Sequence, residues 1–361
     1  MTENTTPTSQ SVPSSPDPAG AESPALSPHP SAAVDDVGTH ERTRTAQKSS
    51  KPTLQGWVHL VLLGLVLIAG ALLRLAGSNW GEYQYLHPDE RFLIWVGTDI
   101  SPVQNLGDYF DTENSSLNPN NRGHNFYVYG TLPMFITRYV VEWVYGHSGF
   151  NEMTNVGRLL SALADLLSLM LVYLIAARLY NRRVALLATA FSAFAVLQIQ
   201  QSHFFTMDTF INLFTLLALY FAVQVAMPEQ DHTASQTPKP GVADAFSDPL
   251  LWLSVGFGVA LGMAVASKLN AALMAMALPV ALGMRLARTP KQEWDRFLPR
   301  ALAYLGLAAV LSVLVFRIAQ PYAFSGPGFF GISPNPKWVA QIKELAAQGS
   351  GDIDMPPSLQ W

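Results

Sequence analysis

The sequence predicts an all-α protein that crosses a membrane several times. Charged residues make up 13% of the 361 residues, about half the usual share of a soluble protein. Seven apolar runs come close to or reach the roughly 20 residues that a helix needs to cross a hydrocarbon core. These runs are 56–77, 159–179, 184–201, 209–227, 250–267, 269–286 and 301–319.

The apolar share of 49% looks ordinary because two unlike regions are averaged. Residues 1–53 are dominated by Ser, Thr, Pro and Ala, so we expect a disordered cytoplasmic tail with no signal peptide. We expect 54–320 to form the transmembrane module and 321–361 an external, incomplete segment. The absence of cysteine excludes a disulfide framework and thiolate catalysis, and the net charge of −4 argues against a nucleic-acid binder.

An eighth apolar stretch, 126–146, is ambiguous because Arg138 and Glu142 lie near its middle. Loops rich in Lys and Arg stay in the cytoplasm, and so does the basic flank that precedes the first run. If 126–146 crossed the membrane, the basic clusters at 178–183 and 285–300 would fall outside. We therefore predict that 126–146 lies on the surface, within a large external loop of residues 79–157 that carries interfacial helices.

Acidic residues stand at two places on the predicted external face. Asp89 and Glu90 follow Pro88 in WGEYQYLHPDERF, residues 80–92, and Asp208 opens a span after QQSHFFTM. Adjacent carboxylates can act as a general base or bind a hard metal ion. They also fit the first turn of a helix or a helix cap, and these plainer roles stay open here.

Cations gather at the same predicted boundary, against the usual trend. Each one alone can extend to lipid headgroups, but together with the acids they indicate a mixed-charge site that could hold a phosphate. The four cations are Arg74, Arg158, Lys268 and Arg317. His203 lies nearby, and a histidine at this place is also read as an ordinary hydrogen-bonded side chain.

Asp165 is predicted to lie deeper in the membrane, two turns after Arg158. It is either a functional carboxylate or a tie between helices through a basic partner. Aromatic residues around the external loop form a predicted interfacial belt, a few of which could stack on a sugar. They are Trp57, Trp80, Tyr83, Tyr85, Trp95, Tyr127, Tyr129, Tyr139 and Trp143.

The order of these motifs resembles the GT-C superfamily of membrane glycosyltransferases, in the branch of protein O-mannosyltransferases and the lipid A aminoarabinose transferase. The resemblance covers about residues 56–320. It rests on LHPDERF (86–92), FYVYGTLPMFITR (126–138), GRLLSALADLLSLMLVYLIAARLYNRR (157–183), QQSHFFTMDTFINLF (200–214) and GMAVASKLNAAL (262–273). It implies a GT-C-like bundle with further spans after this region, so we expect the chain to be C-terminally truncated.

The resemblance also implies site residues. Asp89 matches the family's general base with Glu90 beside it, Asp208 matches its second acidic position, and Lys268 falls in the turn associated with the lipid phosphate. The implied reaction is an inverting transfer from a polyprenyl-phosphate sugar donor to a lipid, glycan or protein acceptor outside the plasma (inner) membrane. Arg158, Arg317, Arg74 and His203 would help to bind the substrate. No cofactor is required, although the acids are compatible with a divalent cation.

Two other functions stay open from the sequence. A transporter or flippase of lipid-linked sugars would use Asp165 and the outer cations for coupling, although the sequence shows no convincing internal repeat of the kind that transporters carry. A membrane anchor or scaffold would leave the outer charges without a role.

Overall fold

The computed structural model describes residues 54–82, 84–228 and 246–351. The predicted tail, the middle of the loop after the fourth span and the last ten residues lie outside the described residues. All statements below concern the unit that begins at Pro52.

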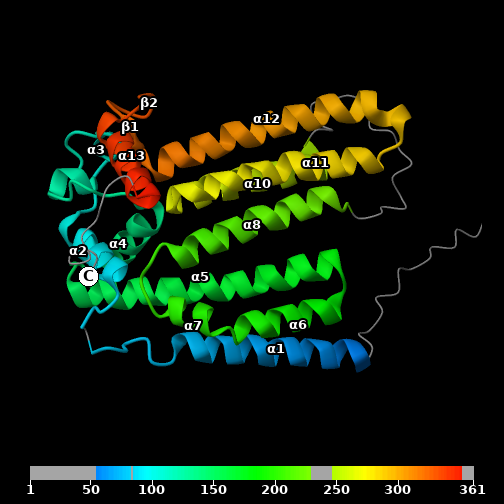
Figure 1. The fold of residues 1–361 in the computed structure, drawn as a ribbon, viewed down its shortest axis with the longest axis horizontal. Coiled ribbons are helices and arrows are strands. Elements are labelled where there is room, and N and C mark those ends of the chain that lie inside the picture. Colours follow the sequence, from blue (N-terminus) through cyan, green and yellow to red (C-terminus); the bar gives the residue numbers. More distant parts are fainter. Residues whose placement is uncertain (1–53, 83, 229–245, 352–361) are drawn as a thin grey trace, which may run out of the picture. The chain divides into compact units, whose positions relative to one another are not determined.

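Long helices lie side by side and form a bundle (Figure 1). Among the described residues, six helices are long and apolar enough to cross a membrane, or seven if the bent pair α6 and α7 counts as one span. The predicted multi-pass helical fold is thereby confirmed. The bundle consists of α1 (Leu54–Leu75), α5 (Phe150–Leu179), α6 (Arg182–Ala193), α7 (Val196–Ser202), α8 (Asp208–Ala226), α10 (Pro249–Ser267), the 3-10 helix η2 (Leu269–Met276), α11 (Ala277–Arg288), the 3-10 helix η3 (Lys291–Glu293) and α12 (Trp294–Ala319).

Helix α10 packs closely against α12 because small residues face the contact. A Cβ on Gly258 would lie 2.4 Å from the Ala308 carbonyl oxygen, and one on Gly262 would lie 2.6 Å from the Ser312 carbonyl oxygen. The two glycines are four residues apart, which is the small-xxx-small spacing that lets membrane helices approach. This contact fixes the ends of both helices, where Lys268 and Gln320 follow.

Shorter elements gather at one end of the bundle, which we call the α2 end (Figure 1). Helices α1 and α12 finish at this end, and α5 and α8 begin there. Strands β1 and β2 pair antiparallel there, with Phe324 opposite Pro334. The end elements are α2 (Pro88–Asp99), α3 (Leu106–Tyr109), η1 (Pro119–Arg122), α4 (Thr131–Tyr145), η4 (Pro321–Ala323), β1 (Phe324–Ser325), β2 (Ser333–Pro334) and α13 (Pro336–Ser350).

Helix α4 corresponds to the ambiguous stretch 126–146 and is not among the candidate spans. It has 15 residues, which is too short to cross a bilayer. One face is buried, with Met134 and Val141 inaccessible, while Trp143 on the other is 85% exposed. Arg138 donates to the Ile100 carbonyl and to Glu142, at 3.0 and 2.7 Å. This arrangement agrees with the prediction that the stretch lies on the surface and does not cross the membrane.

The run 184–201, predicted as one continuous span, is broken. Helices α6 and α7 meet at an angle of 60° after Ala193. A break frees carbonyl oxygens at the end of α6, and buried carbonyls need donors. Arg74 of α1 supplies them, because its guanidinium donates to the oxygens of Ala193 and Ser192 at 2.9 and 3.3 Å.

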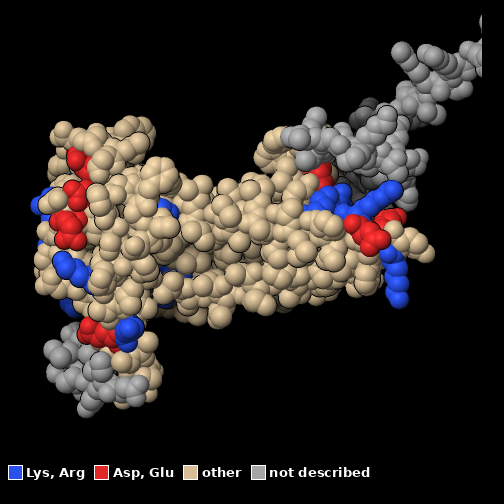
Figure 2. All heavy atoms as spheres, turned by 90° about the horizontal axis from the view of Figure 1, so that it is seen from above, with Lys and Arg blue, Asp and Glu red and all other residues tan. Residues whose placement is uncertain are grey.

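Charged side chains lie mostly at the two ends of the bundle. In the face shown in Figure 2, blue and red atoms collect at both ends, and the middle is almost entirely occupied by other residues. This distribution fits a hydrocarbon layer around the middle, because a charge at the bilayer centre costs several kcal/mol.

Candidate active site

Helix α2 places the two adjacent acids in different surroundings. His87 caps the helix, with its Nδ1 accepting from the Glu90 backbone N–H at 3.4 Å, and Pro88 occupies the first helical position. Neighbouring helix positions point about 100° apart. Asp89 is therefore half-buried at the edge of the protein, whereas Glu90 is fully buried.

Asp89 is held by a tyrosine from the loop before α4. The Tyr129 hydroxyl donates to Asp89 Oδ1 at 3.0 Å. Burial raises the pKa of Tyr129, and the Asp89 and Asp208 carboxylates raise it further. The hydroxyl thus keeps its proton at neutral pH and keeps donating to Asp89. Asp208 acts on this hydroxyl through its charge alone, whereas Asp89 also accepts its hydrogen bond.

Glu90 belongs to a buried ion pair that joins α2 to α5. Arg158 Nε and Nη2 donate to the two Glu90 carboxylate oxygens, each at 2.7 Å, and the Phe205 backbone N–H donates to Oε1 at 2.9 Å. The remaining Arg158 nitrogen donates to the carbonyls of Ser78 and Trp80. Four of the five N–H donors of Arg158 and both carboxylate oxygens of Glu90 thus bond within the protein.

Asp208 and Lys268 form a more open pair. Lys268 Nζ donates to Asp208 Oδ1 at 2.8 Å, and each side chain is 40% exposed. Asp208 begins α8, and Lys268 is the extended residue between α10 and η2. A lysine ammonium has three donors, so it can meet a further anion while it keeps its bond to Asp208.

The segment after Tyr129 brings the two pairs together. The Gly130 N–H donates to the Ser267 carbonyl at 3.1 Å, and a Cβ on Gly130 would lie 2.1 Å from the Ala266 oxygen, so the contact requires glycine. Tyr129 directly precedes Gly130 and Lys268 directly follows Ser267, so this hydrogen bond holds the backbones of Tyr129 and Lys268 close together. We call Asp89, Tyr129, Asp208 and Lys268 the polar site.

Gln320 fixes the same segment from α12. Its Oε1 accepts from both the N–H and the hydroxyl of Thr131, each at 2.6 Å. The Thr131 hydroxyl also lies 2.6 Å from the Ala319 carbonyl oxygen. The polar site is therefore built between elements that α10 and α12 hold in place.

Arg74 of α1 and Asp165 of α5 form a buried ion pair. Arg74 Nε donates to Asp165 Oδ2 at 2.5 Å, and the two residues are 0% and 3% exposed. Both side chains are buried within the protein, where the pair links α1 to α5 and to the end of α6. Neither side chain is therefore accessible to a substrate. This agrees with the reading of Asp165 as a tie between helices.

Arg317 and His203 are also engaged within the protein. Arg317 is 3% exposed and donates to the carbonyls of Pro321, Gly328 and Phe329. Three aromatic rings, those of Phe110, Phe324 and Phe329, surround its guanidinium within 6 Å. His203 lies with its two ring nitrogens 2.7 and 3.0 Å from the carbonyl oxygens of Ile199 and Ala76.

The structure thus brings Asp89, Asp208 and Lys268 together among the predicted site residues and places the others in structural contacts. Tyr129, Gly130 and Gln320 were missed as site residues by the sequence analysis. Tyr129 was indistinguishable from the other aromatic residues of the loop. Gln320 did carry a signal, because it is an uncharged polar residue directly after an apolar span.

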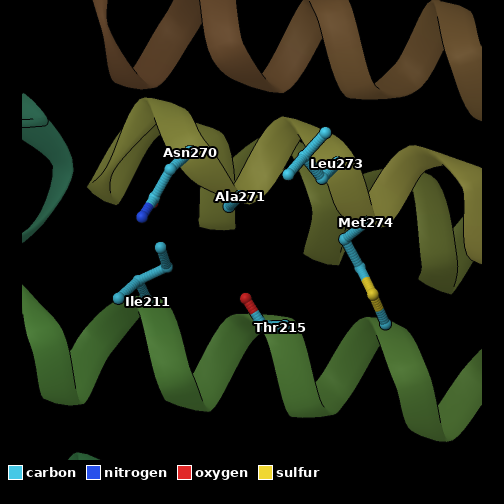
Figure 3. A pocket seen from close by; sticks show the side chains of 6 residues that line it. All are labelled: Ile211, Thr215, Asn270, Ala271, Leu273 and Met274. Carbon is cyan, nitrogen blue, oxygen red and sulfur yellow. The ribbon is translucent and has the colours of Figure 1, made fainter. Parts of the chain in front are cut away.

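Side chains from α8 and η2 face one another across an apolar groove (Figure 3). It has a volume of about 380 Å³ and lies between α8 and η2. Ile211 lies one turn after Asp208, and Leu273 of η2 is 83% exposed. Its lining residues are Ile211, Thr215, Asn270, Ala271, Leu273 and Met274.

Within 54–82, 84–228 and 246–351, no group of three or more His, Asp or Glu residues could hold a metal ion. Asp89 and Glu90 do not converge on one point, since Glu90 is bound to Arg158. A divalent cation stays a prediction.

Known structures share this fold. The Archaeoglobus fulgidus oligosaccharyltransferase in the apo form matches with a TM-score of 0.52 and 16% identity over 84% of this chain and 34% of that one. The same enzyme tethered with an acceptor peptide matches with 0.51 and 16% over 82% and 34%. The S. cerevisiae protein O-mannosyltransferase Pmt1-Pmt2 complex bound to the sugar donor gives 0.49 and 17% over 77% and 35%.

This chain spans about one third of the length of those structures. No curated protein matches this chain. The family model described as dolichyl-phosphate-mannose-protein mannosyltransferase matches residues 122–320, which is more than half of the chain. The chain therefore belongs to this mannosyltransferase family and has the fold of GT-C membrane glycosyltransferases.

Proposed function

We propose that the protein transfers a sugar from a polyprenyl-phosphate donor to an acceptor hydroxyl or amine with inversion. The observation that carries the proposal is that the Asp208–Lys268 pair stands within about one helical turn of Ile211 and Asn270, which line the apolar groove. The groove offers space for an isoprenoid chain, and Lys268 offers a charge for its phosphate. The family description names dolichyl phosphate mannose, a donor of this class.

The proposed site faces the outside of the plasma membrane, with the N-terminus in the cytoplasm. Support comes from the opposite end of the bundle, where basic residues gather as the positive-inside rule requires of a cytoplasmic side. These are Arg178, Arg182, Arg183, Arg285, Arg288, Lys291, Arg296 and Arg300.

In the proposed reaction Asp89 acts as the general base. It takes the acceptor proton while the acceptor oxygen or nitrogen attacks the anomeric carbon, and the bond from that carbon to the phosphate oxygen breaks. Tyr129 occupies Oδ1 of Asp89 and orients the carboxylate, which leaves Oδ2 for the acceptor. Half-burial keeps the group accessible but fixed, as a base needs.

Lys268 stabilises the departing phosphate in this proposal, and Asp208 positions the ammonium. Arg74, Arg158, Arg317 and His203 then support the site by tying its helices, and Glu90 anchors α2. This assigns them a different role from the direct substrate binding that the sequence suggested. Their bonds to protein groups are the basis for the change.

The proposal is tested by reconstituting the protein in liposomes with a radiolabelled sugar on three carriers. Transfer from the polyprenyl monophosphate is expected, with none from the polyprenyl pyrophosphate or the nucleotide sugar. Equal transfer from the nucleotide sugar would contradict the assignment of the groove to the donor lipid.

Lys268→Met is expected to lower kcat about 10²–10³-fold, which is the effect of removing one charged or hydrogen-bonding group from a developing anion. Lys268→Arg keeps the charge and is expected to retain more activity than the methionine variant. Single-turnover transfer in liposomes measures both. Wild-type kcat in Lys268→Met would show that the ammonium does not meet the phosphate.

Thr215→Trp is expected to raise the KM for a long-chain donor at least about tenfold, because the indole fills the groove. The KM for a donor with a single isoprene unit should change little. Val280→Trp is the matched control, since Val280 is 56% exposed on α11 and does not line the groove. If Thr215→Trp changed the KM of both donors by the same factor, or of neither, the groove would not be the binding site of the donor lipid.

The transporter alternative required Asp165 to act in coupling. Asp165 is 3% exposed and bonded to Arg74 at 2.5 Å, which favours a structural role and hence the transferase. Movement of a fluorescent short-chain donor across the liposome membrane without an acceptor would favour transport instead.

A further inference from the structure

A second cleft lies along one face of α2. It has a volume of about 570 Å³, larger than the groove between α8 and η2. The α2 residues that line it are three or four positions apart, so they form one stripe down the whole helix. We call it the α2 cleft; its lining residues are Pro88, Arg91, Phe92, Trp95 and Asp99 of α2 and Phe150 of α5.

One end of the α2 cleft lies at the residue before the proposed base. Pro88 directly precedes Asp89, and the Phe92 ring lies 5.8 Å from the ring of Tyr129, which holds Asp89. A molecule bound in the cleft would have one end next to the reacting carboxylate. On the proposed function, this is the position of an acceptor, while the donor lipid lies in the groove between α8 and η2.

A buried histidine fixes the far part of the α2 cleft. His124 is 6% exposed, its ring meets the Trp95 ring edge-on at 5.1 Å, and its Nε2 lies 2.9 Å from Asp99 Oδ2. Trp95 is nevertheless 53% exposed and the Asp99 side chain 41%. The cleft therefore presents a rigid indole and an adjacent carboxylate whose Oδ1 is available.

Arg91 adds a donor on the same stripe. Its side chain is exposed, and within the described part of the chain neither its guanidinium nor the Trp95 indole N–H has a hydrogen-bond partner. The cleft thus combines flat apolar faces with a carboxylate acceptor and guanidinium donors. Ligand sites that fix orientation have this composition of apolar walls and a few placed polar groups.

We infer that the α2 cleft binds a carbohydrate acceptor. A pyranose has C–H faces that pack on an indole and neighbouring hydroxyls that can donate to Asp99 and accept from Arg91. An extended peptide is bound mainly through main-chain hydrogen bonds. Between its first and last turns helix α2 offers none along the cleft, because its backbone groups bond within the helix. The inference rests on the proposed function for the role of acceptor.

The first test measures binding without a donor. Saturation-transfer NMR on the full chain in nanodiscs uses methyl glycosides of glucose, galactose and mannose, and a serine- and threonine-containing hexapeptide. Transfer to ring protons of at least one glycoside is expected, with loss of the signal in Trp95→Ala. Trp143→Ala is the control, because Trp143 is 85% exposed on α4 and does not line the cleft. A signal from the peptide alone would overturn the inference.

The second test measures transfer with the same acceptors. Trp95→Ala and Asp99→Asn are expected to raise the KM of the glycoside acceptor about tenfold, with kcat and the donor KM within about twofold of wild type. Transfer to the peptide that both variants leave unchanged would refute a carbohydrate acceptor and leave the proposed function intact. Glycoside binding that depends on Trp95, without transfer from any polyprenyl donor, would instead refute the proposed function.

Discussion

Asp89→Asn is expected to reduce kcat for sugar transfer by about 10²–10⁴-fold, the usual contribution of a positioned general base. The amide keeps the shape of the side chain and its bond from Tyr129, but it cannot take the acceptor proton. Initial rates with saturating donor and acceptor measure the loss. Donor binding should change little, since Lys268 and the groove are unaffected.

Glu90→Gln separates this chemical effect from damage to helix α2. Glu90 is not accessible to a substrate, because it is fully buried and bonded to Arg158. Its replacement should lower stability, whereas Asp89→Asn should leave the unfolding temperature close to wild type. If Asp89→Asn transfers sugar at the wild-type rate, another group removes the proton.

Arg158→Met is expected to destabilise the protein by about 3–5 kcal/mol, because it leaves the Glu90 carboxylate buried without its partner. Arg158 is 3% exposed and Glu90 is inaccessible, so water cannot replace the lost bonds without opening the α2 end. Thermal unfolding in detergent and resistance to protease both measure the effect. Activity should fall with the folded fraction.

A double variant and a control make this prediction specific. Glu90→Gln combined with Arg158→Met removes both charges and should recover part of the stability, so the two effects should not add. Arg300→Met serves as control, because Arg300 is 42% exposed and 3.5 Å from Asp248, a pair that contributes about 1 kcal/mol or less. Equal losses in Arg158→Met and Arg300→Met would contradict the role of burial.

The sequence predicted the bundle well because hydrocarbon imposes a length and a composition on each span. The sequence also predicted that 126–146 does not cross the membrane. An additional crossing there would place the basic loops outside, against the positive-inside rule. The sequence did not predict the break after Ala193. Neither proline nor glycine stands there, and the break is satisfied by Arg74, a partner 119 positions away.

The site was predictable only by residue type and boundary. Asp89 and Glu90 are adjacent carboxylates, yet one is half-buried beside Tyr129 and the other is paired with Arg158. Whether an acid lies beside Tyr129 or pairs with Arg158 depends on the direction in which its side chain points from α2. That direction relative to the other helices is set by long-range packing. For the same reason the outer cations looked alike, although the Lys268 side chain is 40% exposed and Arg317 is enclosed by aromatic rings.

The bond between Gly130 and Ser267 can form only late in biosynthesis, after Ser267 has been added. Asp89 precedes Lys268 by 179 residues, and a ribosome adds about 5–20 residues per second. The first acid therefore emerges roughly 10–40 s before the lysine. During that interval no α10 exists to hold the Tyr129 segment, so the nascent chain carries Asp89 long before the contact that positions Tyr129 can form.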